Sequence, residues 1–386
     1  MELSSSTIDG RDTLAGARRV VQSGGFGFGG SRLGPARRLR YHPPVLRVPN
    51  EWVSRLRPRF EGRPVCISGG AGFIGGHLVD ALLSLGATIS IVDDLSNSTA
   101  EHIGELIDIE PDRVRFVHGS ILDDAALRDA FEQADTVFHL AAVSSVPRSV
   151  SDPERSFAVN AIGTMRVAEA ARRAGVKRVV YSASSSAYGA SERMPKVETD
   201  LPEPVSPYAA SKLAGEHVML SWARSYGLST VSLRYFNIFG PRQPADSPYS
   251  GVIALFARKL LAGQTPAIFG DGRQSRDFTF VANAVLANLL AAASDRPFSG
   301  EVINVGAGER TELLQLVRTM AELCGVSHLK PTFQPARVGD VRHSLADLSR
   351  AHELLGYQPI VGLADGLAQT LDWYRAEIDD PARKPV

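Results

Sequence analysis

The stretch 64–76, PVCISGGAGFIGG, decides the fold. A short apolar run from Val65 leads into three glycines, Gly69, Gly72 and Gly75, and apolar residues then recur at helical spacing up to Leu83. This order predicts a strand, a tight turn and a helix. Glycine is needed in such a turn because the chain bends sharply, approaches a pyrophosphate and packs the new helix on its strand. The helix N-terminus would offer unpaired N–H groups to those phosphates.

A second apolar run, 88–92, ends in Asp93. In a unit of this kind a carboxylate at that place holds the ribose hydroxyls of NAD and repels the 2′-phosphate of NADP. Asp94 beside it could share this task. Alternatively, Asp93 only caps the next segment of the chain. Taken together, the glycine turn and the carboxylate predict an NAD-binding domain.

Composition excludes several classes of protein. With 386 residues, 44% of them hydrophobic, the chain can bury a large core in one big or two modest domains. No apolar stretch approaches the about 20 residues that a membrane span requires. A formal net charge of zero gives no electrostatic case for nucleic acid, so we expect a small-molecule partner. Two cysteines, Cys66 and Cys324, suit a reducing cytoplasm and give no metal framework.

Residues 1–60 differ in composition from the rest of the chain. The segment 24–30 is glycine-rich, and arginines outnumber acidic residues around it. We expect a basic, partly disordered N-terminal extension without the apolar core of a secretory signal. An arm that wraps a dimer partner, or a start codon assigned too far upstream, are the alternatives. At its end, 50–60 carries Trp52 and Leu56 and predicts a short helix docked on the domain.

From residue 64 onward, strand and helix patterns alternate. Strands are expected at 64–68, 88–93, 114–118, 135–140, 177–183 and 229–234, with helices between them at 72–85, 98–108, 123–133, 153–174 and 206–226. Such alternation predicts an α/β fold, a Rossmann-type doubly wound parallel sheet with helices on both faces. We assign 61–235 to the NAD-binding domain, whose core continues into parts of 236–300. The less regular remainder, 236–386, with a helix near 362–376, is expected to form a smaller C-terminal α/β region that binds substrate.

Three polar residues predict the chemistry. Tyr208 and Lys212, in SPYAASKLAGE, are four residues apart in an expected helix and therefore share one side of it. A lysine ammonium there can stabilise a phenolate and lower the pKa of the tyrosine. Ser184, just past an apolar strand, can hydrogen-bond a reacting hydroxyl. The Tyr–Lys spacing alone is more often found on a helix surface than in a catalytic site.

The glycine turn, Asp93, FHLAA at 138–142, Ser184 and the Tyr208–Lys212 pair follow one another as in the extended short-chain dehydrogenase/reductases, which the chain resembles from about 64 to 376. Four further motifs resemble the nucleotide-sugar 4-epimerases, most closely the UDP-N-acetylglucosamine 4-epimerase branch. They are SVPRSVSDP at 145–153, LRYFNIFGPRQ at 233–243, GDGRQSRDF at 270–278 and GDVRHSLADLSRAHELLGYQP at 339–359.

The resemblance implies tightly bound, recycled NAD held by Gly69, Gly72, Phe73, Ile74, Gly75, Asp93, Asn97, Ser120, Ile121, Leu140, Ala141, Ala142, Asn160, Tyr208, Lys212 and Tyr235. It also implies a UDP-sugar site made of Ser144, Ser184, Ser185, Ser186, Tyr208, Asn237, Gly251, Val252, Ala267, Phe269, Arg276, Arg337, Asp340 and Ser344. In that site Arg276 and Arg337 would hold the diphosphate, and Asp340 the uridine ribose. On residue type alone, Arg276 beside Asp277 could equally form a surface ion pair. The sequence departs from many relatives at Ser120, where an acid usually meets the adenine amine, and at Ser68, where threonine is usual.

The implied reaction oxidises C4 of a UDP-hexose and reduces it again from the other face, without a metal. Tyr208 as phenolate would take the 4-hydroxyl proton, and Ser184 would share that hydrogen bond. Ser344 is small where related UDP-glucose enzymes carry tyrosine, so the site should admit an N-acetyl group. Alternatively, Ser344 lies in a surface loop and touches nothing.

Several alternatives remain open at this point. The substrate could be UDP-glucose or UDP-galactose, or UDP-glucuronate if Arg242 or another arginine faces a C6 carboxylate. Dehydratases and decarboxylases of the superfamily need an acid where this chain has Ser185 and Ser186. A non-catalytic NAD-binding regulator is the alternative from another class. The resemblance further implies a homodimer through a four-helix bundle of 98–108 and 153–174, although the apolar positions there, Phe157, Ile162, Met165 and Val167, equally suit core packing.

Overall fold

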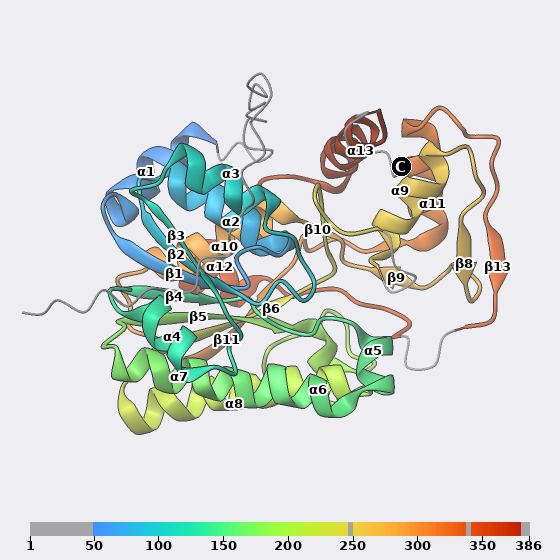
Figure 1. The fold of residues 1–386 in the computed structure, drawn as a ribbon. Coiled ribbons are helices and arrows are strands. Elements are labelled where there is room, and N and C mark those ends of the chain that lie inside the picture. The colour runs from blue at the N-terminus through green and yellow to red at the C-terminus, as the bar shows by residue number, and fades with distance from the viewer. Residues whose placement is uncertain (1–48, 246–249, 337–340, 380–386) are drawn as a thin grey trace, which may run out of the picture. The chain divides into compact units, whose positions relative to one another are not determined.

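Seven parallel strands form the central sheet of the computed structural model, which describes residues 49–245, 250–336 and 341–379 (Figure 1). Their order is β11 (Ser299–Val305), β6 (Ser229–Tyr235), β5 (Arg178–Ser184), β4 (Thr136–His139), β1 (Pro64–Ser68), β2 (Thr88–Asp93) and β3 (Val114–His118). β1 lies between β4 and β2, so Ile67 pairs with Phe138 on one side and Ile91 on the other. The predicted doubly wound parallel sheet is confirmed.

The strand β11 lies beyond the segment in which the sequence predicts core structure. It pairs with β6 in parallel and forms one edge of the sheet. Its sequence, SGEVINV, includes Gly300 and polar residues, so it lacks the continuous apolar run that marks strands buried on both faces. The C-terminal half of the chain therefore completes the sheet as well as forming a region of its own.

Helices cover both faces of the sheet (Figure 1). One face carries α1 (Asn50–Phe60), α2 (Phe73–Ser84), α3 (Glu101–Ile109), α10 (Val281–Ala293) and α12 (Ser349–Leu355). The other carries α4 (Asp124–Phe131), α5 (Val146–Ser151), α6 (Pro153–Phe157), α7 (Thr164–Arg173) and α8 (Pro207–Tyr226). The predicted helix at 50–60 is confirmed as α1, which buries Leu56 and Phe60 in the core. The rest of the N-terminal extension lies outside the described residues.

The helix predicted at 153–174 is interrupted. A π-helical segment, η1 (Ala158–Gly163), joins α6 to α7. It contains Asn160, whose buried side chain binds the backbone of Val143, while its carbonyl accepts a hydrogen bond from Thr164 Oγ1 at 2.6 Å. Such π segments are frequent at functional sites, and the 3.6-residue hydrophobic period of a helix does not predict them. The interruption directs Asn160 toward the chain that leaves β4.

The remaining elements form the smaller C-terminal region. Its helices are α9 (Val252–Leu261), α11 (Leu313–Leu323) and α13 (Leu363–Asp379), which pack on one another. Three short strand pairs accompany them: β7 (Ile238–Phe239) with β10 (Thr279–Phe280), β8 (Ala267–Phe269) with β13 (Thr332–Gln334), and β9 (Ser275–Arg276) with β12 (Thr311–Glu312). A single 3-10 turn, η2 (Ser185–Tyr188), follows β5. Within the described ranges, no helix is long and apolar enough to cross a membrane.

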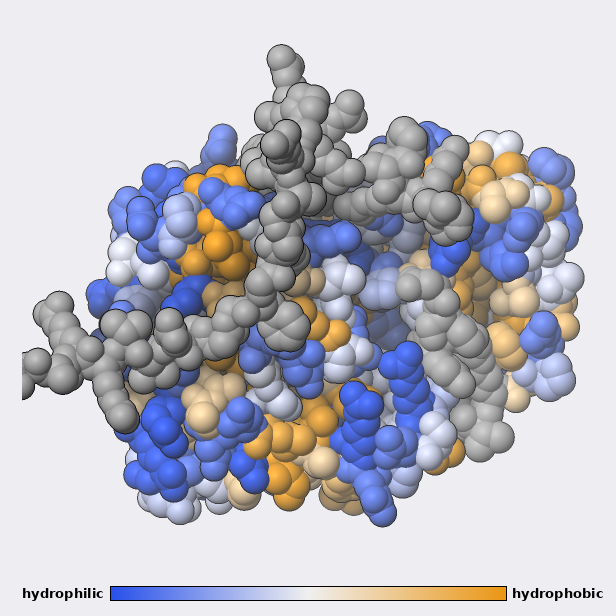
Figure 2. Space-filling view, in the orientation of Figure 1, coloured by the Kyte–Doolittle hydropathy of each residue, from blue (hydrophilic) through white to orange (hydrophobic). Residues whose placement is uncertain are grey.

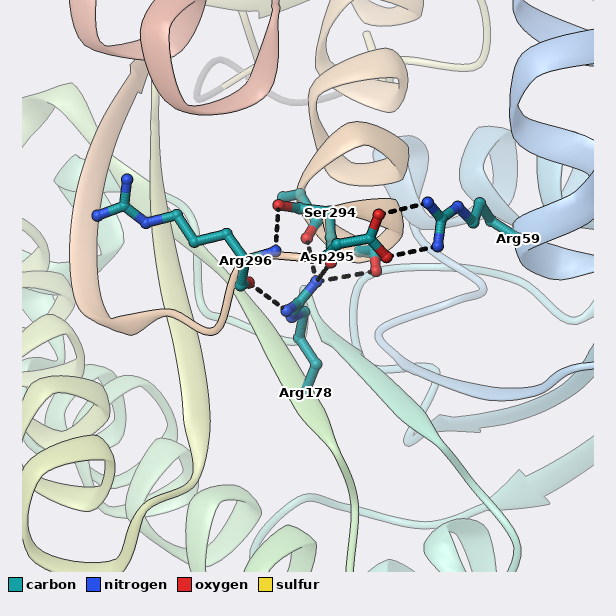
Figure 3. A network of polar contacts seen from close by, with 7 residues as sticks. Arg59, Arg178, Ser294, Asp295 and Arg296 are labelled. Atoms are coloured by element: carbon teal, nitrogen blue, oxygen red, sulfur yellow. Dashed lines mark hydrogen bonds and ion pairs between the residues drawn. The ribbon is translucent and has the colours of Figure 1, made fainter.

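An arginine at the start of β5 ties the sheet to the end of α10 (Figure 3). The guanidinium of Arg178 donates to four carbonyl oxygens, those of Ala291, Ala292, Ser294 and Arg296, at 2.6 to 3.1 Å. The carbonyls of Ala291 and Ala292 lie in the last turn of α10 and have no further helical N–H to accept from, so a cation beside them is favourable. Asp295 in the same turn pairs with Arg59 of α1. This network lies at the amino ends of the strands, opposite the expected site.

The two helices expected to form a dimer bundle lie on opposite faces of the sheet. α3 packs beside β3 on the face of α2, whereas α7 packs against α8 and α4 on the other (Figure 1). The prediction that 98–108 and 153–174 form one surface is therefore wrong, because the β3 to β4 crossover places them in different layers. Hydrophobic residues gather over the lower helical layer (Figure 2). Phe157, Ile162 and Met165 are 40%, 48% and 37% exposed there, whereas Val167 is fully buried.

Candidate active site

The turn after β1 is the first part of the site. Gly69 has a φ of +78°, and a Cβ there would lie 2.6 Å from the backbone nitrogen of Ala141. A Cβ on Gly75 would lie 2.1 Å from the carbonyl oxygen of Gly69. α2 begins after Gly72, and no side chain of the described residues caps it, so its first N–H groups can meet an anion. The turn leaves N–H groups and no side-chain bulk where a pyrophosphate would have to lie.

Asp93 ends β2 and faces this turn. Its Oδ2 accepts the N–H of Ala71 at 3.0 Å, and its Oδ1 accepts from the N–H of Leu95 at 2.9 Å and from Ser98 Oγ at 3.2 Å. Burial raises the pKa of Asp93, and the backbone hydrogen bonds act in the opposite direction. Asp93 thus caps its own loop and also lies beside the glycine turn. Asp94 is exposed and accepts only from its own loop, as far as the described residues show.

Ser184, Tyr208 and Lys212 come together at the carboxyl ends of the strands. Ser184 ends β5, and its Oγ accepts the N–H of Ser186 at 3.2 Å and its hydroxyl at 2.9 Å. α8 packs beside the turn that follows Ser184. The helix begins at Pro207 because Ser206 Oγ caps it and a proline is favourable in the first turn. Tyr208 and Lys212 lie one turn apart on this helix, and Ser184 lies near enough to the Tyr208 hydroxyl to influence its pKa. The structure therefore assembles the three residues that the sequence singles out.

The pKa values of these groups depend on burial. Burial raises the pKa of Tyr208, and the hydrogen bond with Ser184 lowers it only in part. Burial also lowers the pKa of Lys212 to about 7, against the opposing charge of Glu216. The Lys212 ammonium lies 4.4 Å from the ring centroid of Tyr181. The lowered tyrosine pKa that we expect from the sequence is thus not supplied by these protein groups alone, because desolvation dominates at a buried phenol.

The chain that leaves β4 is held against the glycine turn. The N–H groups of Leu140 and Ala141 both donate to the carbonyl of Ser68 at 2.9 Å. Asn160 accepts from the N–H of Val143 at 2.8 Å and donates to its carbonyl at 3.0 Å. These contacts fix the segment 140–143, where we expect the cofactor, at one side of β1.

Two residues expected near the cofactor direct their hydroxyls elsewhere. The hydroxyl of Tyr235 accepts from Ser182 Oγ at 3.1 Å and from Asn288 Nδ2 at 2.6 Å, inside the core. Only its backbone could serve a cofactor at the end of β6. Ser120 Oγ accepts the N–H of Leu122 at 3.3 Å and so caps its own turn.

Asp277 gathers the segments expected to bind the sugar-nucleotide. Its buried carboxylate accepts backbone N–H groups of Ala307 at 2.8 Å, Gly308 at 3.1 Å and Ala346 at 3.2 Å. Its carbonyl accepts from Asn237 Nδ2 at 3.2 Å. Burial raises the pKa of Asp277 to about 6, and these backbone hydrogen bonds oppose the shift. The carboxylate points inward, so the alternative of a surface ion pair with Arg276 is wrong.

Ser344 lies next to Arg276 in space. The N–H of Ser344 donates to the carbonyl of Ser275 at 3.1 Å, and the N–H of Ser275 donates to that of Arg342 at 3.0 Å. The guanidinium of Arg276 bonds the carbonyls of Ser275 and Arg342. Ser344 is half-buried in the loop that precedes α12.

The other expected substrate residues lie on neighbouring elements. Gly251 precedes α9, Val252 starts it, and β8 spans Ala267–Phe269. Gln274 donates to the carbonyl of Phe269 and so connects β8 to the strand of Arg276. Ser144 is exposed ahead of α5, and Ser185 and Ser186 are half-buried in η2. Arg337 and Asp340 lie outside the described residues.

Arg242 contacts α2, the helix that follows the glycine turn. Its Nη2 lies 2.5 Å from Asp80 Oδ2 and 2.7 Å from His77 Nδ1, both on α2. His102 of α3 pairs with the other oxygen of Asp80 at 2.8 Å. Burial lowers the pKa of His77 to about 3, so the ring is neutral and accepts this hydrogen bond. The sequence gives no sign of this cluster, because its members come from three separate segments.

Comparison with known proteins places these features in context. Residues 65–306 match the model of the NAD dependent epimerase/dehydratase family. A UDP-glucose 4-epimerase of Mycolicibacterium smegmatis is 42% identical over 80% of this chain and 97% of its own length. The solved UDP-N-acetylglucosamine 4-epimerase of Methanobrevibacter ruminantium, in complex with UDP-N-acetylmuramic acid, is 36% identical over 82% of this chain and 99% of that one, with a TM-score of 0.77. A UDP-glucuronic acid 4-epimerase of Bacillus cereus is 30% identical over 81% and 99%, with a TM-score of 0.75.

Proposed function

The chain belongs to the NAD-dependent epimerase/dehydratase family, and from this membership we propose that it epimerises C4 of a UDP-hexose, first of all UDP-N-acetylglucosamine and UDP-N-acetylgalactosamine. UDP-glucose and UDP-galactose are the next candidates. The observation that carries the proposal is the run Ser184, Ser185 and Ser186 beside Tyr208. All three side chains are hydroxyls and none is an acid, and they lie near a tyrosine that can act as a base.

The site fits NAD. The glycine turn would hold the pyrophosphate on the N-terminus of α2, and Asp93 would hold the adenosine ribose. When bound, NAD supplies the redox chemistry by accepting a hydride from C4 and returning it, so that net redox is zero. Cofactor that is never consumed can stay bound between turnovers.

The protein's own residues handle the proton. Tyr208 would remove the proton of the 4-hydroxyl, and Ser184, which lies beside Tyr208, would orient that hydroxyl. Because burial raises the pKa of Tyr208, the phenolate requires added positive charge. Lys212 one turn away supplies it in its protonated form, and a nicotinium ring would add to it.

The alternative reactions lack their groups. Dehydration across C5 and C6 needs an acid and a base beside the substrate, which the hydroxyls of Ser185 and Ser186 cannot replace. UDP-glucuronate is the alternative to these two pairs of sugars, yet Arg242 is engaged with Asp80 and His77 and does not support it. Small Ser344, fixed beside Arg276, favours an acetamido sugar. Intact Ser184, Tyr208 and Lys212 argue against a non-catalytic regulator.

We also propose a homodimer through the α6–α7 and α8 layer. Phe157, Ile162 and Met165 expose apolar side chains on adjoining turns of the segment from α6 to α7. The neighbouring Val167 is buried in the core. Light scattering at micromolar concentration should give twice the monomer mass, and a monomer would contradict this proposal. A cytoplasmic location rests on the two free cysteines, of which Cys66 is buried.

The proposed function is tested by incubating the purified protein with UDP-N-acetylglucosamine, UDP-glucose, UDP-glucuronate and their C4 epimers. We expect interconversion of the acetamido pair without added NAD, and bound NAD released on denaturation. If the protein turns over UDP-glucuronate and none of the other sugars, UDP-glucuronate is its substrate. Absence of turnover on all six, with NAD bound, would favour the regulator.

A further inference from the structure

A hydrogen bond joins the two loops on either side of the glycine turn. Nη1 of Arg148 on α5 donates to Oδ1 of Asn97 at 2.9 Å, across 51 residues of sequence. Asn97 follows β2, and Arg148 follows β4. These two strands flank β1 in the sheet. The hydrogen bond therefore connects the segments that leave the two neighbours of β1, whereas the glycine turn leaves β1 itself.

Both ends of this contact are anchored. Asn97 belongs to the loop that Asp93 holds through the N–H of Leu95 and the hydroxyl of Ser98. Arg148 lies on α5, which begins at the capping Ser145. Little backbone freedom remains to be lost when the two side chains meet, so the contact costs less entropy than one between two free loops.

The residue after Arg148 connects the same helix to the catalytic tyrosine. Ser149 is buried, its hydroxyl donates to the carbonyl of Val146 at 2.6 Å, and it accepts the N–H of Tyr208 at 3.0 Å. α5 thus touches the loop beyond Asp93 through Arg148 and the first turn of α8 through Ser149. A dinucleotide lying along the carboxyl end of β1 would be bordered by both contacts.

We propose that Arg148 and Asn97 form a strap across the dinucleotide site that slows the release of NAD, so that the cofactor stays bound while the sugar turns between its two half-reactions. This inference rests on the proposed function. Arg148 acts as a retaining residue through Asn97, whose amide nitrogen can still donate to a cofactor hydroxyl. The strap itself is exposed, so it can open without disturbing the core.

The test measures release of NAD from the purified holoenzyme after dilution into an excess of an unrelated dehydrogenase that consumes free NAD. Arg148→Ala and Asn97→Ala should each speed release by about three- to tenfold, the range for one typical hydrogen bond, because both side chains are exposed to solvent. The double variant should release NAD no faster than the faster single variant, because both remove one interaction. Arg155→Ala, an exposed arginine on α6, is the matched control and should release NAD like the wild type. Unchanged thermal unfolding of the variants would show that each is folded.

Two outcomes would overturn the strap alone. Release from Arg148→Ala at the wild-type rate is the first. The second is a double variant whose acceleration is the product of the single ones, which would show that each residue holds NAD independently. A protein that binds no dinucleotide would overturn the proposed function, and the strap with it.

Discussion

The carboxylate of Glu216 on α8 forms a bidentate ion pair with the guanidinium of Arg234 on β6, with 2.9 Å between Oε1 and Nε and 2.8 Å between Oε2 and Nη2. Both side chains are almost fully buried. Burial lowers the pKa of Arg234, but the hydrogen bond and charge of Glu216 outweigh it and the pKa ends above its ordinary value. The pair lies one turn beyond Lys212 and fixes α8 to the sheet.

Removing one partner of this pair should be costly. Arg234→Ala leaves the Glu216 carboxylate buried without its cation, and we expect the free energy of unfolding to fall by about 3–5 kcal/mol. Urea denaturation measures this change. The double variant Glu216→Leu with Arg234→Leu should lose less than either single variant, because no buried charge remains. A double variant that loses the sum of the two would contradict this account.

Tyr208→Phe should abolish turnover while NAD and UDP-sugar still bind, because it removes the base and little packing surface. We expect a loss of about 100-fold or more in kcat, the usual contribution of a positioned base. Lys212→Met should lose activity and part of the bound NAD. Tyr226→Phe on the same helix is the control, since Tyr226 is 57% exposed and far along α8. Wild-type activity of Tyr208→Phe at every pH from 6 to 10 would sink the mechanism.

Asp277 should make stability depend on pH. Its pKa is raised to about 6 in the folded protein by burial, from an ordinary value near 4. The native state therefore binds the proton more tightly than the unfolded chain, so this contribution to stability is full below about pH 4 and is lost as the pH rises to about 6. We predict that the difference in unfolding free energy between wild type and Asp277→Asn falls over this window and is constant above pH 7. A difference that rises with pH would mean that the backbone hydrogen bonds outweigh burial.

The inner strands and the grouping of Ser184, Tyr208 and Lys212 could be predicted from the sequence, and the contacts that assemble them could not. A strand buried on both faces must be apolar throughout, and the glycine turn after β1 has few alternatives, so both leave local patterns. Asp277 instead acts on backbone groups 30 and 69 residues away, and Arg148 on a residue 51 away. The residues next to Asp277 in the sequence do not show whether its carboxylate is buried among backbone N–H groups or lies on the surface beside an arginine. The π segment at Asn160 and the edge strand β11 went unpredicted for the same reason, since tertiary contacts decide both.

Asp93 should select NAD over NADP, because the 2′-phosphate would meet a carboxylate held beside the glycine turn. Two unit charges about 4 Å apart near a protein surface repel by about 1 to 4 kcal/mol, so Asp93→Ala should narrow the preference by about tenfold or more. Titration of each variant with the two cofactors gives the ratio of dissociation constants. Asp94→Ala is the matched control, since Asp94 is exposed and turned to its own loop. Tightly bound NADP in the purified wild type would contradict the assignment.

The last prediction concerns the size of the substrate and depends on Ser344. Its backbone is fixed by the hydrogen bond to Ser275, one residue from Arg276, so a larger side chain cannot simply move away from a sugar-nucleotide held there. Extra volume in a filled site costs about 1–3 kcal/mol, or about one to two decades in specificity. Ser344→Tyr should therefore lower kcat/KM for UDP-N-acetylglucosamine far more than for UDP-glucose.

Two controls make this result specific to the sugar. Ser344→Ala keeps the space open and should retain activity on both sugars, and Ser349→Tyr adds the same side chain at an exposed position on α12. If the size of the residue at 344 determines which sugar fits, kcat/KM changes for one sugar while the NAD content stays constant. Equal losses on both sugars in Ser344→Tyr would show that the residue supports the fold of the site instead of reading the C2 substituent.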